Sequence, residues 1–155
     1  MQFKAGGGRL NIQSTSHSKT PPAPRRRDSS NHRRGWTERI RIRRVYETPN
    51  AADGYRILVD RVWPRGMTKE RVRASLWLKS IAPSAALRTW FNHDPSRWQM
   101  FKRRYYIELG KNSDEVKRLR DAIAQGTVTL LYAAKDDKRN QAVALKEYLL
   151  AILNR

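Results

Sequence analysis

The sequence predicts an α/β fold: a single compact domain with a small, mostly parallel sheet flanked by helices, preceded by a disordered basic arm. Along residues 35–155, short apolar runs alternate with longer segments whose apolar residues recur every three or four positions, as expected when helices connect parallel strands. Residues 1–34 are poor in aliphatic side chains and rich in Gly, Ser, Pro and Arg. They cannot bury enough surface to offset the entropy lost on ordering.

The first half of the domain is predicted to contain two strands and a short helix. Apolar and basic residues alternate from about Ile40 to Tyr46, which is typical of a strand with two different faces. Ile57–Val59 is a continuous aliphatic run, as in a central strand covered on both faces. Thr68 can then cap a short helix from Lys69 to Ala74. Residues 76–78 form a further short strand or a buried connection.

The second half is predicted to contain four helices and one strand. Each of the first three helices follows a residue whose side chain can accept a hydrogen bond from the first turn: Ser84, Asp94 and Ser113. Pro95 suits the first helical position after Asp94, and Gly110 is expected to end that helix. The expected spans are about 84–91, 95–110 and 113–124 for these helices, 127–132 for the strand and 140–152 for the last helix.

The charge of the chain indicates a polyanionic partner. The sequence holds 33 Lys and Arg against 14 Asp and Glu, which gives a formal net charge of +19 at pH 7. Residues 1–34 contain eight basic residues and one acidic residue, so the arm carries +7 and the domain +12. We expect DNA, single- or double-stranded, rather than an anionic membrane, because no basic amphipathic helix with a large apolar face is evident.

Composition also excludes several classes of function. The chain has no cysteine, so thiolate catalysis, disulfides and thiolate metal sites are excluded, and its three histidines show no zinc-binding spacing. No apolar run approaches the length of a membrane span, and no signal peptide is evident. We therefore expect a cytoplasmic, nucleoid-associated protein without a membrane partner.

A dense group of charged and aromatic residues follows the central strand. Asp60, Arg61 and Trp63 come almost directly after it. Ligands of open α/β sheets bind beyond the carboxyl ends of the strands, so we expect a site here. The same edge should carry the residues that follow the strand at 127–132, and residues 88–94 could form a wall. A structural alternative stays open, in which Asp60 pairs with Arg61 and Trp63 covers the core.

Several stretches of the domain carry a resemblance to a known family. The most specific is Tyr55–Gly66, which reads YRILVDRVWPRG. Further matching positions are Trp77, Trp90, Phe91, His93, Asp94, Phe101, Tyr105 and residues 129–136. From Ile42 to about Leu150 the chain thus resembles the domain-of-unknown-function 488 family, in its YeaO-like branch. The resemblance implies a compact α/β domain and, as a proposed activity, uracil excision from DNA, although the chain lacks the water-activating and His-containing loop motifs of well-known uracil-DNA glycosylases.

Uracil excision would need groups that hold the flipped base, stabilise a cation-like sugar and contact phosphates. A carboxylate can stabilise the sugar cation, and a guanidinium can bind the uracil oxygen that gains negative charge. No metal or other cofactor is expected, and uracil is the product. The resulting assignment is Asp60, Arg88 and Asp94 for catalysis; Arg61, Trp63, Trp90, His93 and Tyr132 for base binding; and Arg65, Lys69, Arg71, Arg73, Lys135, Arg25, Arg26 and Arg27 for DNA phosphates. Structural roles stay open for Arg88 on a solvated face, Asp94 as a helix cap and Trp90 in the core.

Three functions follow as hypotheses. The first is a DNA base-excision enzyme, most simply a uracil-DNA glycosylase that needs no metal. The second is a non-catalytic DNA- or RNA-binding protein whose arm and Arg-rich helix faces contact phosphates. The third is a Mg²⁺-dependent nuclease that uses Asp60, Asp136 and Asp137, since hard cations prefer clustered carboxylates. All three predict a DNA affinity that falls steeply with salt.

Overall fold

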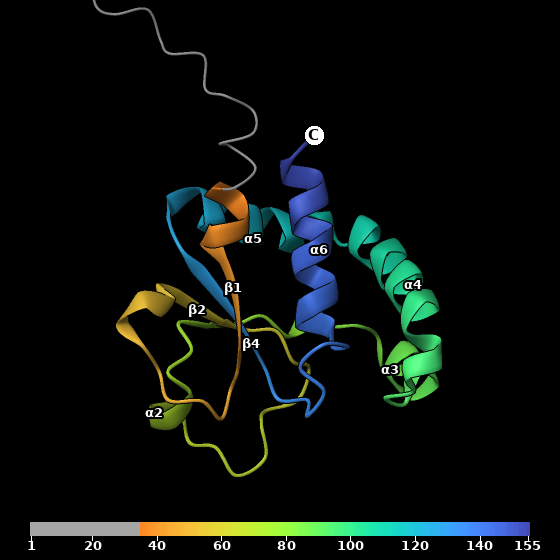
Figure 1. Ribbon diagram of the computed structural model, residues 1–155, viewed down its shortest axis with the longest axis horizontal. Helices are drawn as coiled ribbons and strands as arrows, with labels where there is room; N and C mark the ends of the chain where they lie inside the picture. The colour runs from red at the N-terminus through yellow and green to blue at the C-terminus, as the bar shows by residue number, and fades with distance from the viewer. Residues whose placement is uncertain (1–34) are drawn as a thin grey trace, which may run out of the picture.

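The computed structural model describes residues 35–155, which form a four-stranded sheet flanked by helices (Figure 1). The strand order is β1-β4-β2-β3, and every neighbouring pair is parallel. The strands are β1 (Ile40–Arg44), β2 (Tyr55–Leu58), β3 (Leu76–Trp77) and β4 (Val128–Tyr132). The predicted α/β class and its small parallel sheet are confirmed. The predicted basic arm lies outside the described residues.

Four helices cover one face of the sheet and enclose the main core. They are α3 (Ala85–Phe91), α4 (Trp98–Lys111), α5 (Ser113–Gln125) and α6 (Gln141–Leu153). Their apolar sides pack against alternate strand residues, among them Ile57, Leu130 and Tyr132. Within the described part of the chain, no helix combines the length and the apolar character that a membrane span requires.

Shorter segments cover the second face of the sheet. Leu58 and Leu131, which alternate with the residues of the main core, pack against Met67 and Val72. Val72 belongs to α2 (Lys69–Val72), which lies across the strands from α6 in Figure 1. The segment that carries α2 is therefore held against the sheet near the carboxyl ends of β2 and β4.

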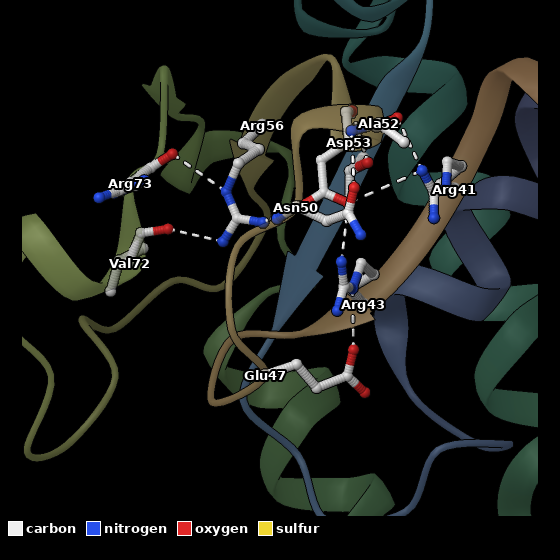
Figure 2. Close-up of polar contacts among 10 residues, drawn as sticks. Arg41, Arg43, Glu47, Asn50, Ala52, Asp53, Arg56, Val72 and Arg73 are labelled. Atoms are coloured by element: carbon white, nitrogen blue, oxygen red, sulfur yellow. Dashed lines mark hydrogen bonds and ion pairs between the residues drawn. The ribbon is translucent and has the colours of Figure 1, made fainter.

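A buried carboxylate organises the other half of this second face (Figure 2). Asp53 has no exposed surface, and its Oδ1 accepts a hydrogen bond from Arg43 Nη1 at 2.9 Å. Its Oδ2 accepts a hydrogen bond from Arg56 Nη1. Arg56, itself buried, also donates to the backbone oxygens of Val72 at 2.7 Å and Arg73 at 3.1 Å. This Asp53 network ties β1, β2 and the end of α2 together.

Several predicted caps are confirmed. The hydroxyls of Thr68 and Ser84 accept hydrogen bonds from the backbone N–H groups three residues further on. Asp94 caps a short turn, since its carboxylate accepts from the backbone N–H of Ser96 at 2.9 Å. The 3-10 turns are η1 (Ala51–Asp53), η2 (Lys79–Ile81) and η3 (Pro95–Arg97), and residues 35–39 are helical.

Other predicted boundaries differ from the structure. The helix expected at 95–110 is divided into η3 and α4, which begins at Trp98. It continues through Gly110 to Lys111, and the buried Leu109 anchors its last turn, so the low helix propensity of Gly110 does not end it. Ser113 begins α5 and does not cap it, because Asn112 occupies the capping position.

Candidate functional site

A cavity of about 530 Å³ opens at the carboxyl ends of β2 and β4. We call it the strand-end cavity. Its walls come from the loops after β2 and β4, from α3 and the residues that follow it, and from the start of α6. Its polar lining consists of Asp60, Arg61, Arg88, Thr89, Asn92, His93, Arg139, Asn140 and Gln141. The cavity lies at the sheet edge where the sequence predicts a site. Of the wall predicted at residues 88–94, all but Trp90 and Asp94 line the cavity.

Asp60 is held by groups from three neighbouring elements. Its Oδ2 accepts a hydrogen bond from the backbone N–H of Ala133, just after β4, at 3.0 Å. Its Oδ1 accepts a hydrogen bond from Gln141 Nε2 at the start of α6. Trp77 Nε1 donates to the backbone oxygen of Asp60 at 2.7 Å. The carboxylate therefore has a fixed orientation at the junction of β2, β4 and α6.

Burial raises the pKa of the Asp60 carboxyl to about 6, because the charged form loses hydration. The hydrogen bond from Ala133, the positive charge of Arg88 and the hydrogen bond from Gln141 act in the opposite direction and do not overcome it. At neutral pH the carboxyl group is thus ionised in surroundings that disfavour its charge. Groups with a pKa perturbed in this way are found at functional sites more often than elsewhere.

We expect Asp60→Asn to stabilise the protein at pH 8. The folded pKa of about 6 lies above the unfolded value, so the folded state holds the proton more tightly. The contribution of Asp60 to stability is therefore greatest below about pH 4, falls as the pH rises to about 6 and is constant above that. The shift corresponds to roughly 3 kcal/mol at pH 8, and the neutral amide would recover this charge cost less the loss of one of the two acceptor oxygens that serve Ala133 and Gln141.

Urea unfolding at several pH values between 4 and 8 measures this effect. Asp137→Asn, which neutralises an exposed carboxylate on the loop after β4, is the matched control. The control should keep the pH dependence of the wild type between pH 4 and 6, whereas Asp60→Asn should lose it. An equal pH dependence in Asp60→Asn and the wild type would contradict the assignment.

The cations of the strand-end cavity differ in their freedom. Arg61 is fixed, because its guanidinium donates to the backbone oxygens of Pro83 at 3.2 Å and Ala82 at 3.1 Å. Arg61 and Asp60 form no ion pair within residues 35–155, so the structural alternative of such a pair is wrong. Arg88 is exposed, and its side chain forms no ion pair within residues 35–155. Its guanidinium is available to a ligand.

The wall of the cavity after α3 has an unusual backbone. Asn92 and His93 follow one another with φ values of 45° and 53°, in the left-handed region that most side chains avoid. Asn92 is the C-terminal cap of α3, where this conformation is common, but His93 is not explained by capping. Such strain costs on the order of 1 to 3 kcal/mol, and the packing around it must hold it in place. It directs the chain so that His93 lines the cavity.

The structure places the predicted aromatic base-binding residues elsewhere. Trp63 Nε1 donates to the backbone oxygen of Met67 at 2.7 Å, on the second face of the sheet. The guanidinium carbon of Arg104 lies over the ring of Trp90, 4.1 Å from the centre of that ring. Tyr132 is buried in the main core. None of these three rings lines the cavity, whereas the predicted base-binding residues Arg61 and His93 do.

The remaining predicted carboxylates do not join Asp60. Asp94 lies outside the cavity lining and caps η3. Asp136 accepts hydrogen bonds from the backbone N–H groups of Lys138 and Arg139, so it stabilises the loop before α6. No group of three or more Asp, Glu, His or Cys residues in the described part of the chain could hold a metal ion. The carboxylate cluster on which the nuclease hypothesis depends is therefore not formed.

Four of the eight predicted phosphate contacts lie on one exposed segment. Arg65, Lys69, Arg71 and Arg73 are all exposed, and none takes part in an ion pair among the described residues. We call residues 65–73 the basic segment. Figure 2 shows how Arg56 holds its end by donating to the backbone of Val72 and Arg73. Lys135 is exposed after β4, and Arg25, Arg26 and Arg27 lie outside the described residues.

Sequence reasoning missed residues that the start of α6 brings to the cavity. Arg139, Asn140 and Gln141 line it, and Gln141 contacts Asp60 across 81 positions of the chain. A signal was present. The loop after the last strand of a parallel sheet ends at the same edge as the other strand ends, so the cap and first turn of the next helix must approach it.

Comparison with known proteins defines the family of the chain. A family model described as "Inactive DUF488-N3 subclade" matches residues 39–155. The uncharacterized protein YeaO of Escherichia coli (strain K12) is 40% identical over 113 residues, which cover 73% of this chain and 98% of YeaO. The uncharacterized proteins Mb3100c of Mycobacterium bovis and Rv3073c of Mycobacterium tuberculosis are each 40% identical over 111 residues, which cover 72% of this chain and 93% of each relative. No solved structure matches the chain significantly. The resemblance seen in the sequence is confirmed at the level of the family: the chain belongs to the DUF488 family.

Proposed function

We propose that the chain is a nucleic-acid-binding domain that performs no catalysis of its own. The observation that carries this proposal is the basic segment, whose four cations are exposed and have no acidic partner among the described residues. With Glu70 as its acidic member, the segment has a formal charge of +3. Exposed, unpaired cations beside a sheet edge are suited to contacts with successive phosphates.

The packing of the basic segment supports the proposal. Met67 and Val72 fix the segment on the sheet, and Arg56 donates to its backbone oxygens. The side chains of Arg65, Lys69 and Arg71 thus project from a backbone that is already ordered. A preorganised surface loses less conformational entropy when it binds a polyanion than a flexible one does.

Two observations support the absence of catalysis. The matching family model describes its subclade as inactive. In the strand-end cavity, Asp60 is the carboxylate that lines the wall, and both of its oxygens already accept hydrogen bonds from Ala133 and Gln141.

A base-excision activity, with uracil as the base, is the second candidate. Asp60 favours it, because a half-buried carboxylate with a raised pKa beside a free guanidinium is a suitable group to stabilise a cation-like sugar. The two candidates differ in one result. Only the base-excision candidate predicts a uracil-specific cleavage that depends on Asp60.

We expect a variant that replaces Arg65, Lys69, Arg71 and Arg73 by Gln to lose at least about tenfold in DNA affinity at low salt. Fluorescence anisotropy with labelled single- and double-stranded oligonucleotides, repeated over a series of salt concentrations, measures the effect. The slope of log K against log salt should shrink by about 0.9 for every phosphate contact that is lost.

A charge-matched control separates a defined surface from general attraction. Lys111, Lys117, Arg118 and Arg120 are also exposed, and α5, which carries three of them, lies at the opposite end of the sheet from α2 in Figure 1. Their replacement by Gln removes the same charge and should change the slope much less. Equal losses in both variants, or no binding by the wild type at low salt, would overturn the proposal.

Single-turnover incubation with a uracil-containing oligonucleotide in EDTA, followed by alkali, tests the second candidate. We expect the strand to stay intact. A uracil-dependent cut that Asp60→Asn abolishes would overturn the proposal of a non-catalytic domain and support the glycosylase.

A further inference from the structure

We propose that the strand-end cavity binds one nucleoside monophosphate, either free or as the phosphorylated end of a nucleic-acid strand. The inference rests in part on the proposed function, because a strand held on the basic segment would bring its end to the same edge of the sheet. It adds a defined ligand to a cavity that the phosphate contacts of the basic segment do not use.

The rim of the cavity is suited to the phosphate. Arg88 from α3, His93 from the loop after it and Arg139 from the loop before α6 reach the cavity from separate parts of the chain. The Arg88 side chain forms no ion pair among the described residues, although its charge acts on Asp60, so binding a phosphate would break no ion pair. A guanidinium can form two parallel hydrogen bonds with phosphate oxygens, which fixes the orientation of the group.

The Asp60 carboxylate in the cavity is suited to accept a hydrogen bond from a ligand. Each oxygen of Asp60 accepts one hydrogen bond from the protein, and a carboxylate oxygen can accept two. Its remaining capacity can take an N–H of a base or a hydroxyl of a sugar. Asp60 would also repel a small anion that entered without such a donor. The cavity therefore favours a ligand that carries an anion at one end and a donor at the other.

The size and the apolar walls agree with one nucleotide. The volume of about 530 Å³ falls within the range of small-molecule sites. Ala82, Pro83 and Phe91 also line the cavity. Such surfaces can contact the face of a base without specifying which base it is.

Calorimetric titration of the full chain with adenosine monophosphate and uridine monophosphate tests the proposal, with adenosine, uridine and inorganic phosphate as partial ligands. We expect both nucleotides to bind about tenfold or more tightly than the nucleosides or phosphate alone. Arg88→Gln should weaken nucleotide binding about tenfold to a hundredfold, because a charge-assisted contact is lost. Arg103→Gln, which removes an exposed charge from α4, is the matched control and should leave it unchanged.

The role of Asp60 and the source of the ligand are tested by separate experiments. Asp60→Asn should reduce the preference for nucleotide over phosphate, since an amide no longer repels the bare anion. Oligonucleotides of one sequence with a 5′-phosphate or a 5′-hydroxyl identify the source: tighter binding of the phosphorylated strand, lost in Arg88→Gln, indicates a strand end. Equal binding of both strands by a protein that binds the mononucleotide indicates a free nucleotide.

Failure of this inference and failure of the proposed function give different results. The variant with four Gln residues in the basic segment should lose oligonucleotide affinity and keep mononucleotide affinity. DNA binding without any mononucleotide binding, or an Arg88→Gln variant that binds nucleotides like the wild type, would overturn the cavity assignment alone. Mononucleotide binding without DNA binding would overturn the proposed function and leave the cavity as a site for free nucleotides.

Discussion

Asp53→Asn is expected to destabilise the protein by about 3 to 5 kcal/mol, because it leaves the buried Arg56 guanidinium without its counter-charge. The side chain of Asp53 is 1% exposed and that of Arg56 7% exposed, so water cannot replace the lost partner. The amide would also lose one of the two acceptor oxygens that now serve Arg43 and Arg56. The midpoint and slope of urea unfolding measure the loss, and an unchanged slope shows that the folded state is the same.

Glu47→Gln is the matched control, because Glu47 also pairs with Arg43 but its side chain is 52% exposed. Its loss should stay within about 1 kcal/mol, as is usual for surface ion pairs. An Arg56→Met variant and the double variant with Asp53→Asn complete a cycle. We expect the double variant to be less destabilised than the sum of the single ones, since no unpaired charge remains. Equal losses in Asp53→Asn and Glu47→Gln would contradict the role of burial.

The same network makes a contribution to acid unfolding. Burial acts to raise the pKa of Asp53, but hydrogen bonds from the backbone of Asn50 and from Arg43 and Arg56 outweigh it and hold the pKa below its ordinary value. The folded state therefore binds this proton less tightly than the unfolded state. The contribution is present above about pH 4 and is lost as the pH falls below it, opposite in sign to that of Asp60.

The fold was predictable because its signals are local. Apolar runs such as Ile57–Val59 mark buried strands, and side chains such as those of Thr68 and Ser84 accept hydrogen bonds within the next turn of the same helix. The parallel order of the strands then placed the site at their carboxyl ends without further information. The location of the cavity followed from the fold class and needed no knowledge of any single contact.

Which charged and aromatic residues line the cavity, and which are held elsewhere, was less predictable, because this depends on tertiary packing. Trp63 is drawn to the backbone oxygen of Met67 on the second face, although it lies only three positions after Asp60 in the sequence. Asp53 resembles an ordinary turn residue before Gly54, and nothing nearby shows that basic residues of β1 and β2 surround it.

The structure separates two kinds of charge in this basic domain. Arg43 and Arg56 are balanced by Asp53 and stabilise the connection between β1, β2 and α2. Arg88 and the cations of the basic segment form no ion pair among the described residues. The paired Arg56 helps to position the unpaired cations, because it donates hydrogen bonds to the backbone oxygens of Val72 and Arg73 at the end of the basic segment. Loss of Asp53 should therefore disturb nucleic-acid binding through the position of α2, without removing any cation from the surface.

Gly54→Ala is expected to cost about 2 to 6 kcal/mol, because it combines backbone strain with a steric clash. Gly54 has a φ of 63° and a ψ of −130°, a conformation that residues with a Cβ rarely adopt. A Cβ built on it would lie 2.3 Å from the backbone oxygen of Thr127. That oxygen accepts the hydrogen bond from the N–H of Tyr55 at 2.9 Å, where the pairing of β2 with β4 begins. The substitution would thus separate the strands whose far ends form the cavity.

Substitutions at two other glycines separate the contribution of backbone strain from that of the steric clash. Gly66 has a φ of 76° but open space around it, so Gly66→Ala should show the strain alone, on the order of 1 to 2 kcal/mol. Gly110 lies in α4 with nothing near it, so Gly110→Ala should stabilise the protein by up to about 1 kcal/mol. Urea unfolding should rank the three variants in this order, and recovery of folded Gly66→Ala and Gly110→Ala but not of Gly54→Ala would lead to the same conclusion. If Gly54→Ala lost no more stability than Gly66→Ala, the contact with Thr127 would have no weight, and the pairing of β2 with β4 would not depend on a glycine at this position.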